Sequence, residues 1–345
     1  MKKVGIIGRV AFNKGLLDGQ TVKTAVLYDE LCKKYTEKEV FCVDTYNYKK
    51  NAIKVMFNFI ICIIRCKHIF LVLSENGRKF FVPLIYFANK ILKRRVYHDV
   101  IGGVVYKDIE KNPKMLKYYN SFVVNWVELK SLKDKLSEMG LKKVEVLPNI
   151  KRLVAVDDKV ANRTTTFPLK LCTFSRVSKS KGILNAINSV TRVNRKHDKK
   201  ILVLDIYGPI ENGFEEEFFS TLNNDFVNYC GMVDFDKSVQ TLSLYDILLF
   251  PTFFQGEGFP GTIIDAFYSA TPVICTDWHY NSEIIEYGKT GFYYDYKTPN
   301  KLDEYLDMII QNIDILTDMR KNCLFESKKY DADKLIKIIF DKIEE

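Results

Sequence analysis

Short apolar runs alternate with longer amphipathic stretches along most of this chain. The runs at 4–8, 69–73 and 169–174 hold five or six mostly apolar residues, as expected of strands buried on both faces of a parallel sheet. Between such runs, apolar side chains recur three or four residues apart, which indicates helices that bury one face. This alternation is typical of βαβ units, so the pattern predicts an α/β fold. The predicted strands are 4–8, 39–44, 69–73, 95–98, 121–125, 144–147, 169–174, 201–206, 226–229, 247–250, 272–275 and 291–294, and the predicted helices are 19–35, 51–66, 78–93, 127–139, 300–311 and 328–344, with others after Gly182 and Gly261.

The alternation is interrupted over residues 156–168, which are polar and lack periodicity. We interpret this stretch as a linker between two Rossmann-like domains, an N-terminal one over 1–155 and a C-terminal one over 169–327. The last residues, 328–345, are predicted to form a helix that packs back on the N-terminal domain. Because ligands bind beyond the carboxyl ends of the strands in such sheets, two domains facing each other across a cleft would suit an enzyme that joins two substrates.

The composition supports folded domains and excludes several classes of protein. The chain has 345 residues, of which 47% are hydrophobic, far from the composition of disordered proteins. The longest apolar stretch, Val55–Ile64, is shorter than the roughly 20 residues that a membrane-spanning helix needs. Eight cysteines occur without a CxxC pair, which argues against a zinc knuckle and favours buried free thiols in a reducing cytoplasm.

Charge is distributed unevenly between the two predicted domains. Residues 1–150 carry 28 Lys or Arg and 14 Asp or Glu, a net charge of +14, whereas residues 151–345 carry 24 and 29, a net charge of −5. A basic half suggests binding to phosphorylated ligands, to an anionic membrane or to nucleic acid, or simply a solvated lysine-rich surface. Nucleic acid is not expected as a partner, because the stacking platforms and reading helices of such proteins are not evident.

The segment most informative about chemistry is a glycine-rich loop between a predicted strand and a predicted helix. It places Glu257 on the loop and Asp265 in the first turns of the helix. Amides at the positive end of a helix dipole hold anions, and carboxylates accept hydrogen bonds from vicinal hydroxyls, so together they fit a ligand with phosphate and sugar groups. The alternative is an ordinary turn with one solvated carboxylate and one helix N-terminal Asp. The residues between the two carboxylates that we expect at the ligand are Gly258, Phe259, Pro260, Gly261 and Thr262.

Two cations follow the first strand of the C-terminal domain. Arg176 comes directly after the strand, and Lys181 follows five residues later, immediately before Gly182. Fixed Arg and Lys side chains can stabilise the negative charge that develops on a departing nucleoside diphosphate. Lys179 lies between them and could take the same role, and the alternative is a polar loop whose lysines are only solvated.

Two features of the N-terminal domain are candidates for the same site. The loop after the first strand holds Gly15 and Gly19, followed by Gln20 and Thr21, and could approach a diphosphate or an acceptor; alternatively it is a simple turn with a helix cap. His98 ends another predicted strand, where an imidazole could orient a hydroxyl or polarise the reacting centre, or serve only as a structural side chain.

In combination and in order, these motifs resemble those of retaining glycosyltransferase family 4, of the type that builds bacterial surface polysaccharides. The spacing from Glu257 to Asp265 is similar to the family's E-x7-E motif, with Asp in place of the usual Glu, and Arg176 with Lys181 matches its Arg and Lys-Gly pair. The resemblance covers nearly the whole chain and implies a GT-B fold. It also implies that Glu257 contacts the donor sugar, that Asp265 holds the ribose hydroxyls, and that His98 faces the donor sugar.

The resemblance further implies the ligands and the reaction. A nucleotide-sugar, expected to be a UDP-sugar, would bind the C-terminal domain near Gly208, with the base against Met232 and Val233, and a glycan or lipid-linked acceptor would bind the N-terminal domain. The diphosphate would leave toward the two cations and the helix amides, and an acceptor hydroxyl would attack from the same face. No cofactor and no metal are implied, because the fixed cations take the metal's role and the two DxD triplets, at 234–236 and 331–333, are explained by chance.

The basic N-terminal half then predicts where the protein acts. Lys93, Arg94, Arg95 and the lysines around 49–54 flank apolar helical faces such as Phe80–Leu92, which favours peripheral association with the anionic inner face of the cytoplasmic membrane. Two alternatives stay open from the sequence: a GT-B-like protein that binds a sugar nucleotide without turnover, and a GT-B sugar-nucleotide epimerase, whose dense carboxylate and histidine cleft is not evident.

Overall fold

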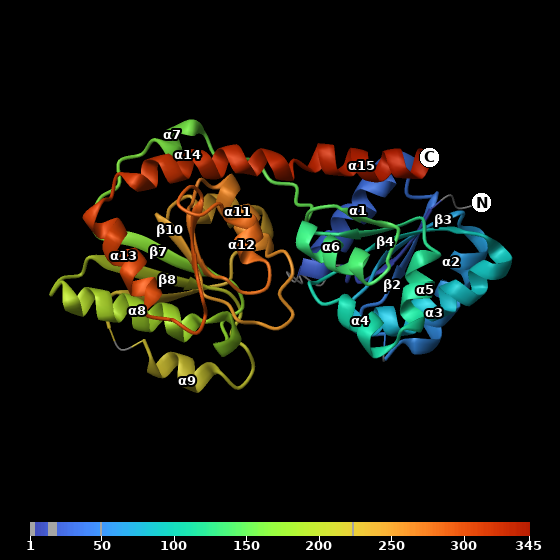
Figure 1. The fold of residues 1–345 in the computed structure, drawn as a ribbon, viewed down its shortest axis with the longest axis horizontal. Coiled ribbons are helices and arrows are strands. Elements are labelled where there is room, and N and C mark those ends of the chain that lie inside the picture. Colours follow the sequence, from blue (N-terminus) through green and yellow to red (C-terminus); the bar gives the residue numbers. More distant parts are fainter. Residues whose placement is uncertain (1–3, 13–18, 49, 223) are drawn as a thin grey trace. The chain divides into compact units, whose positions relative to one another are not determined.

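The computed structural model of the protein describes residues 4–12, 19–48, 50–222 and 224–345. They form two compact units, unit 1 (Met1–Arg152 with Asp331–Glu345) and unit 2 (Leu153–Tyr330). Each unit is built on a six-stranded parallel sheet covered by helices (Figure 1). The predicted α/β fold with two Rossmann-like halves is confirmed.

Unit 1 has the strand order β2-β1-β3-β4-β5-β6. Aromatic rings from neighbouring strands stack on one face of this sheet, Phe70 on Tyr97 at 4.9 Å and Tyr97 on Trp126 at 6.1 Å between ring centroids. Leu27 of α1 and Ile339 of α15 pack in the same core, so the C-terminal helix is part of unit 1. The elements of unit 1 are β1 (Val4–Gly8), α1 (Gly19–Tyr35), β2 (Val40–Asp44), α2 (Ala52–Arg65), β3 (His68–Val72), α3 (Glu75–Leu92), β4 (Arg95–Asp99), α4 (Tyr106–Lys111), α5 (Lys114–Asn120), β5 (Val124–Val127), α6 (Lys130–Glu138), β6 (Val144–Val146) and α15 (Ala332–Glu344).

Unit 2 has the strand order β12-β11-β10-β7-β8-β9. Its two central strands, β7 and β10, are neighbours although some 70 residues separate them in sequence, with Ile247 opposite Leu171. Their carboxyl ends therefore bring two distant loops together, the loop of Lys181 and the loop of Glu257. The elements of unit 2 are α7 (Asp158–Ala161), β7 (Leu169–Phe174), η1 (Lys179–Lys181), α8 (Ile183–Lys196), β8 (Leu202–Tyr207), α9 (Glu215–Ser220), β9 (Val227–Gly231), η2 (Phe235–Lys237), α10 (Ser238–Leu242), β10 (Ile247–Phe250), α11 (Gly261–Tyr268), β11 (Val273–Thr276), α12 (Asn281–Ile284), β12 (Gly291–Tyr294), α13 (Lys301–Gln311), α14 (Ile315–Ser327) and η3 (Lys328–Tyr330).

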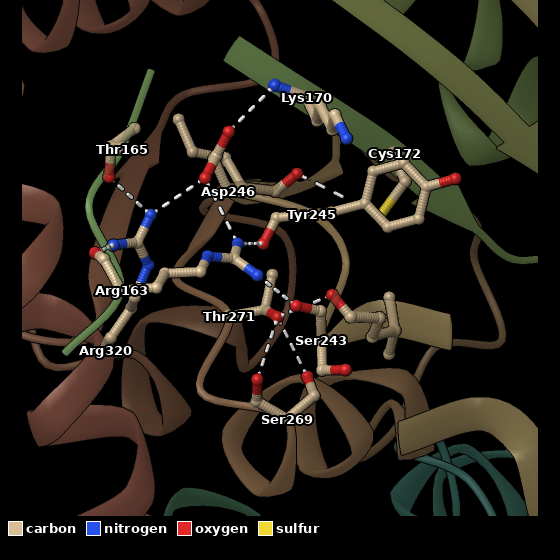
Figure 2. A network of polar contacts seen from close by, with 12 residues as sticks. Arg163, Thr165, Lys170, Cys172, Ser243, Tyr245, Asp246, Ser269, Thr271 and Arg320 are labelled. Atoms are coloured by element: carbon tan, nitrogen blue, oxygen red, sulfur yellow. Dashed lines mark hydrogen bonds and ion pairs between the residues drawn. The ribbon is translucent and has the colours of Figure 1, made fainter. Parts of the chain in front are cut away.

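A buried polar network lies where β7 and β10 begin (Figure 2). Asp246, just before β10, accepts hydrogen bonds from Arg320 of α14 at 2.8 Å and from the backbone amide of Lys170 at 2.9 Å. Arg320 also donates to the hydroxyl of Thr165 at 2.7 Å and to the carbonyl of Arg163 at 3.1 Å. The network thus fixes the polar stretch before β7, which was predicted to be a linker, onto the body of unit 2.

Several predicted elements differ from the structure. The strand predicted at 121–125 lies at Val124–Val127, because Phe122 belongs to the turn that ends α5. The stretch 156–168 contains the short helix α7, whose first turn is capped by the Asp157 carboxylate. The helix predicted from 328 begins at Ala332, after a 3-10 turn. Of the eight thiols, five are buried as predicted, Cys32 and Cys42 are partly buried, and Cys230 is exposed. Among the described residues no helix is long and apolar enough to span a membrane.

Candidate functional site

The loop after β7 holds Lys181 in a defined position. Ser178 is buried, and its hydroxyl accepts a hydrogen bond from the Lys181 amide at 3.3 Å, which caps the 3-10 turn η1. Gly182 follows at φ +71°, and a Cβ there would lie 2.0 Å from the carbonyl oxygen of Pro251. Only glycine fits at this point, since the chain must turn in a left-handed conformation while it touches the strand end of β10. The glycine of the predicted Lys-Gly pair is therefore a requirement of the backbone, whereas the lysine is not.

Lys181 and Glu257 meet at the carboxyl end of the sheet. Lys181 Nζ lies 2.5 Å from Glu257 Oε2, and both side chains are mostly buried. The same carboxylate oxygen accepts a hydrogen bond from the hydroxyl of Thr252, a fully buried residue, at 3.0 Å. The ammonium group also lies 5.1 Å from the ring centroid of Phe254. A charge-assisted contact in a sheltered position fixes both groups relative to the strand ends.

The segment after Glu257 leads into α11 as predicted, with Gly261 as its first residue. Phe259 and Pro260 are buried, and the ring centroid of Phe259 lies 5.3 Å from that of Tyr330. These two residues therefore anchor the loop in the core of unit 2. Thr262 Oγ1 is buried and has no hydrogen-bond partner among the described residues. Asp265 lies in the second turn and is only 3% exposed. Gly258, Gly261 and Thr262 are partly exposed, beside the Lys181–Glu257 pair.

Arg176 and the predicted base-binding residues lie at the neighbouring strand ends. Arg176 is half exposed, and its guanidinium is 3.9 Å from the Glu211 carboxylate. Gly208 follows β8 at φ +135°, and a Cβ there would lie 1.9 Å from the carbonyl oxygen of Ser175, so β7 and β8 approach closely only because position 208 has no side chain. Met232 and Val233 follow β9, and Met232 is exposed.

The predicted residues of the first loop belong mainly to helix α1. Gly19 is its first residue, and Gly15 lies outside the described residues. Gln20 and Thr21 are buried and bonded within unit 1, Gln20 to the carbonyl of Val72 at 3.1 Å and Thr21 as acceptor from Arg9 at 3.0 Å. Their side chains thus join α1 to the strand ends rather than presenting a polar surface.

Lys23, from the same helix, forms a buried ion cluster. Its ammonium lies 2.7 Å from Asp99, at the end of β4, and 3.2 Å from Glu128, which follows β5. Burial raises the pKa of the Asp99 carboxyl to about 6. The cluster ties α1 to the carboxyl ends of β4 and β5, and sequence reasoning assigned it no role.

His98, which the family resemblance places at the donor sugar, is fully buried at the end of β4. Its ring is 0% exposed and stacks on Tyr119 at 5.2 Å. Asn125 donates its amide hydrogens to the carbonyls of Tyr119 and Lys143, so its oxygen faces the ring and His98 Nδ1–H donates to it at 2.9 Å. Nε2 carries the lone pair and has no partner among the described residues. Burial lowers the pKa of His98 to about 3, so the ring is neutral.

Replacing His98 by Gln is expected to make stability less sensitive to acid. The pKa of His98 is lower in the folded state than its ordinary value of 6.5, so the unfolded chain binds more protons below pH 6.5 and the free energy of unfolding falls as the pH falls. This group alone costs about 2 kcal/mol between pH 7 and pH 5. Urea unfolding at both pH values should show a correspondingly smaller loss in the variant. An equal loss in both proteins would contradict a buried neutral ring.

Two residues of the site were not singled out from the sequence. Thr252 holds the Glu257 carboxylate, and Trp278 donates its indole N–H to the carbonyl of Phe254 at 2.8 Å. Both directly follow strands of the sheet, β10 and β11, and a polar side chain at that position was the available signal. Within the described part of the chain, no group of three or more His, Cys, Asp or Glu side chains could hold a metal ion.

Comparisons with known proteins show which sequences and folds this chain is similar to. Residues 168–312 match the family described as "Glycosyl transferases group 1". The uncharacterized glycosyltransferase MJ1069 of Methanocaldococcus jannaschii is 22% identical over 259 residues, which are 74% of this chain and 63% of that protein. Among solved structures, Anabaena HepE in complex with UDP is similar at TM-score 0.75 and 13% identity over 99% of both chains. Sucrose-phosphate synthase from Thermosynechococcus elongatus is similar at TM-score 0.69 and 12% identity over 100% of this chain and 98% of that one. The fold is GT-B.

Proposed function

We propose that this chain is a retaining glycosyltransferase of family 4 that moves a sugar from a UDP-sugar to a glycan or lipid-linked acceptor during synthesis of a surface polysaccharide. The observation that carries the proposal is the contact of Lys181 with Glu257 at the carboxyl ends of β7 and β10, beside the start of α11. The match of residues 168–312 to the glycosyltransferase family covers this whole region. We place the reaction in the cytoplasm, at the inner face of the cytoplasmic membrane.

UDP is the proposed leaving group, because HepE, whose fold is similar, was crystallised with UDP and with UDP-glucose. The diphosphate would lie against the amides at the start of α11, where the helix dipole favours an anion. Lys181 and Arg176 would neutralise it, Asp265 would accept hydrogen bonds from the ribose, and uracil would lie near Met232 and Val233. Glu257 would accept a hydrogen bond from a hydroxyl of the donor sugar.

The proposed reaction retains the configuration at the anomeric carbon without a covalent enzyme intermediate. The bond from the anomeric carbon to the diphosphate oxygen breaks, and the electron pair leaves with UDP toward Lys181 and Arg176. The acceptor oxygen forms the new bond from the same face, and its proton passes to the departing phosphate oxygen. Fixed cations contribute because the negative charge grows during this step. A role for the buried His98 at the donor sugar stays a prediction.

A panel of nucleotide-sugars tests the donor assignment. UDP-sugars at about 100 times their Kd should stabilise the protein by about 2.7 kcal/mol, which for a unit of this size raises the melting temperature by about 5–10 °C. GDP- and ADP-sugars serve as controls and should shift it far less. The UDP-sugar with the largest shift should be hydrolysed slowly to UDP and free sugar. Stabilisation without any hydrolysis or transfer would instead support a sugar-nucleotide-binding protein without turnover.

A further inference from the structure

We propose that the outer surface of α2 and α3 is the membrane-docking surface of the protein, and that its partner is an anionic lipid bilayer. This inference rests on the proposed location at the cytoplasmic membrane and names the surface that binds it; lipid binding itself needs no turnover. The surface exposes apolar side chains, and the same stretch of chain is rich in Lys and Arg. Helix α2 exposes Ile53, Phe57, Ile60 and Ile64.

The exposed apolar residues of α2 lie on one face of the helix. They follow one another at intervals of four, three and four residues, which places them on one side of an α-helix. The opposite side, with Val55, Phe59 and Cys62, is buried against the sheet, and Cys62 lies so close to β1 that a Cβ on Gly5 would be 2.3 Å from its sulfur. The helix is therefore apolar on both faces, although only one of them is covered by this chain.

Helix α3 repeats the pattern and lies beside α2 (Figure 1). Its exposed apolar residues have the same spacing, and Ile91 is 83% exposed. The two helices are held together by the rings of Phe59 and Phe81, 5.1 Å apart, and by Arg94, which donates to the carbonyls of Ile63 at 2.9 Å and Ile64 at 2.6 Å. Their outer faces thus form one fixed patch, larger than the scattered apolar residues of ordinary surfaces. The α3 members are Phe80, Leu84, Phe87 and Ile91.

The charge around the patch favours an anionic partner. Residues 50–95 hold ten Lys or Arg and one acidic residue, Glu75. One of the ten, Arg78, is buried and paired with Asp108, so nine cations and one carboxylate remain, a net charge of +8. Glu75 pairs with Lys79, and among the described residues Lys54, Arg65, Lys67 and Lys93 form no ion pair. A second copy of this chain would bring the same positive charge against it, which argues against self-association. Apolar side chains can enter the acyl region of a bilayer while the unpaired cations near them contact its anionic headgroups.

Cosedimentation of the full chain with vesicles tests the proposal. We expect binding to phosphatidylcholine vesicles that contain phosphatidylglycerol, weak binding to pure phosphatidylcholine, and a loss of binding as salt shortens the Debye length from about 10 Å to about 3 Å. Replacing Phe57 and Ile91 together by Ser should weaken binding at least about tenfold. The matched control replaces Leu244 and Phe325 of unit 2 by Ser. These side chains are 62% and 67% exposed, and the control should bind vesicles as the unchanged protein does.

A second variant and a lipid-free measurement distinguish binding to an anionic bilayer from self-association of the protein. Replacing Lys67 and Lys93 by Glu leaves the apolar patch intact. Each replacement should weaken binding about fivefold or more, so the double variant should bind at least about tenfold more weakly. Equal binding to neutral vesicles, or unchanged binding of both variants, would overturn the proposal. So would a dimer in sedimentation velocity that disappears on replacing Phe57 and Ile91, since the patch would then be a protein interface. Retained donor hydrolysis in the variants separates this result from a failure of the proposed reaction.

Discussion

Replacing Lys181 by Met is expected to lower kcat/KM for sugar transfer at least a hundredfold. The ammonium group is the cation closest to Glu257 and lies at the carboxyl end of the two central strands, where we place the departing diphosphate. Removing one fixed group that stabilises developing charge typically costs about 10²–10³ in kcat. Single-turnover measurement with the UDP-sugar selected by thermal shift separates this loss in the chemical step from weaker donor binding.

The control for this prediction lies in the same loop. Lys179 is exposed and pairs with Glu217 at 2.6 Å, on the outside of the unit. Replacing it by Met removes the same charge two residues away and should leave kcat/KM within about twofold, because exposed ion pairs contribute little. Equal losses in both variants would mean that net charge, rather than the position of Lys181, supports activity.

A double variant distinguishes a role in substrate binding from a role in pairing alone. Removing only one member of a mostly buried ion pair leaves the other charge uncompensated, so a single variant can fail for structural reasons. Replacing Lys181 by Met and Glu257 by Gln together removes both charges. If the pair is only structural, the double variant should recover activity. If each group acts on the donor, it should be no more active than the weaker single variant.

The sequence predicted the parts of this site that short spacings define. Gly182 and Lys181 are adjacent, and Glu257 precedes Asp265 by eight positions, so both motifs are visible without a structure. The contact between them depends on the pairing of β7 with β10, and no local pattern specifies which strands become neighbours. Thr252 was not predicted for the same reason, because its contact with the Glu257 carboxylate exists only in the folded loop. The burial of His98 could not be predicted either, because it results from α5, a helix that the pattern did not indicate.

Helix α14 was not predicted from the sequence either. This helix buries Leu316, Met319 and Cys323 but also Arg320 and Glu326, so charged residues interrupt its apolar periodicity and no helix was predicted there. Helices α13 and α15 bury only apolar residues and were predicted to within a few residues. Helix α1 buries Lys23 and Glu30, but it follows a glycine-rich turn that marked its start in the sequence. Polar groups that are buried in pairs have no signature in a hydrophobic pattern.

Replacing Arg320 by Met is expected to destabilise unit 2 by about 3–5 kcal/mol, the usual cost of breaking a buried ion pair by removing one partner. Arg320 is 0% exposed, and burial lowers the pKa of its guanidinium, whereas the contact with the Asp246 carboxylate raises it and so favours the charged form (Figure 2). Without Arg320, the buried carboxylate keeps, among the described residues, the partly buried contact from Arg163 at 3.1 Å and the amide of Lys170. Urea unfolding at pH 7 should show the loss in the transition of unit 2.

The matched control is Arg192, which binds Asp303 with two hydrogen bonds, at 2.6 and 2.9 Å, on the surface of the same unit. Its side chain is 45% exposed, so replacing it by Met should cost no more than about 1 kcal/mol. If both variants lost the same stability, burial would not be the cause. Replacing Asp246 by Leu in the Arg320→Met background should restore part of the loss, because it removes the uncompensated charge. Asp246 directly precedes β10, and β10 leads into the Glu257 loop. If the network positions that loop, the Arg320→Met variant should lose activity well below its melting temperature. If it does not, activity should persist up to the unfolding transition.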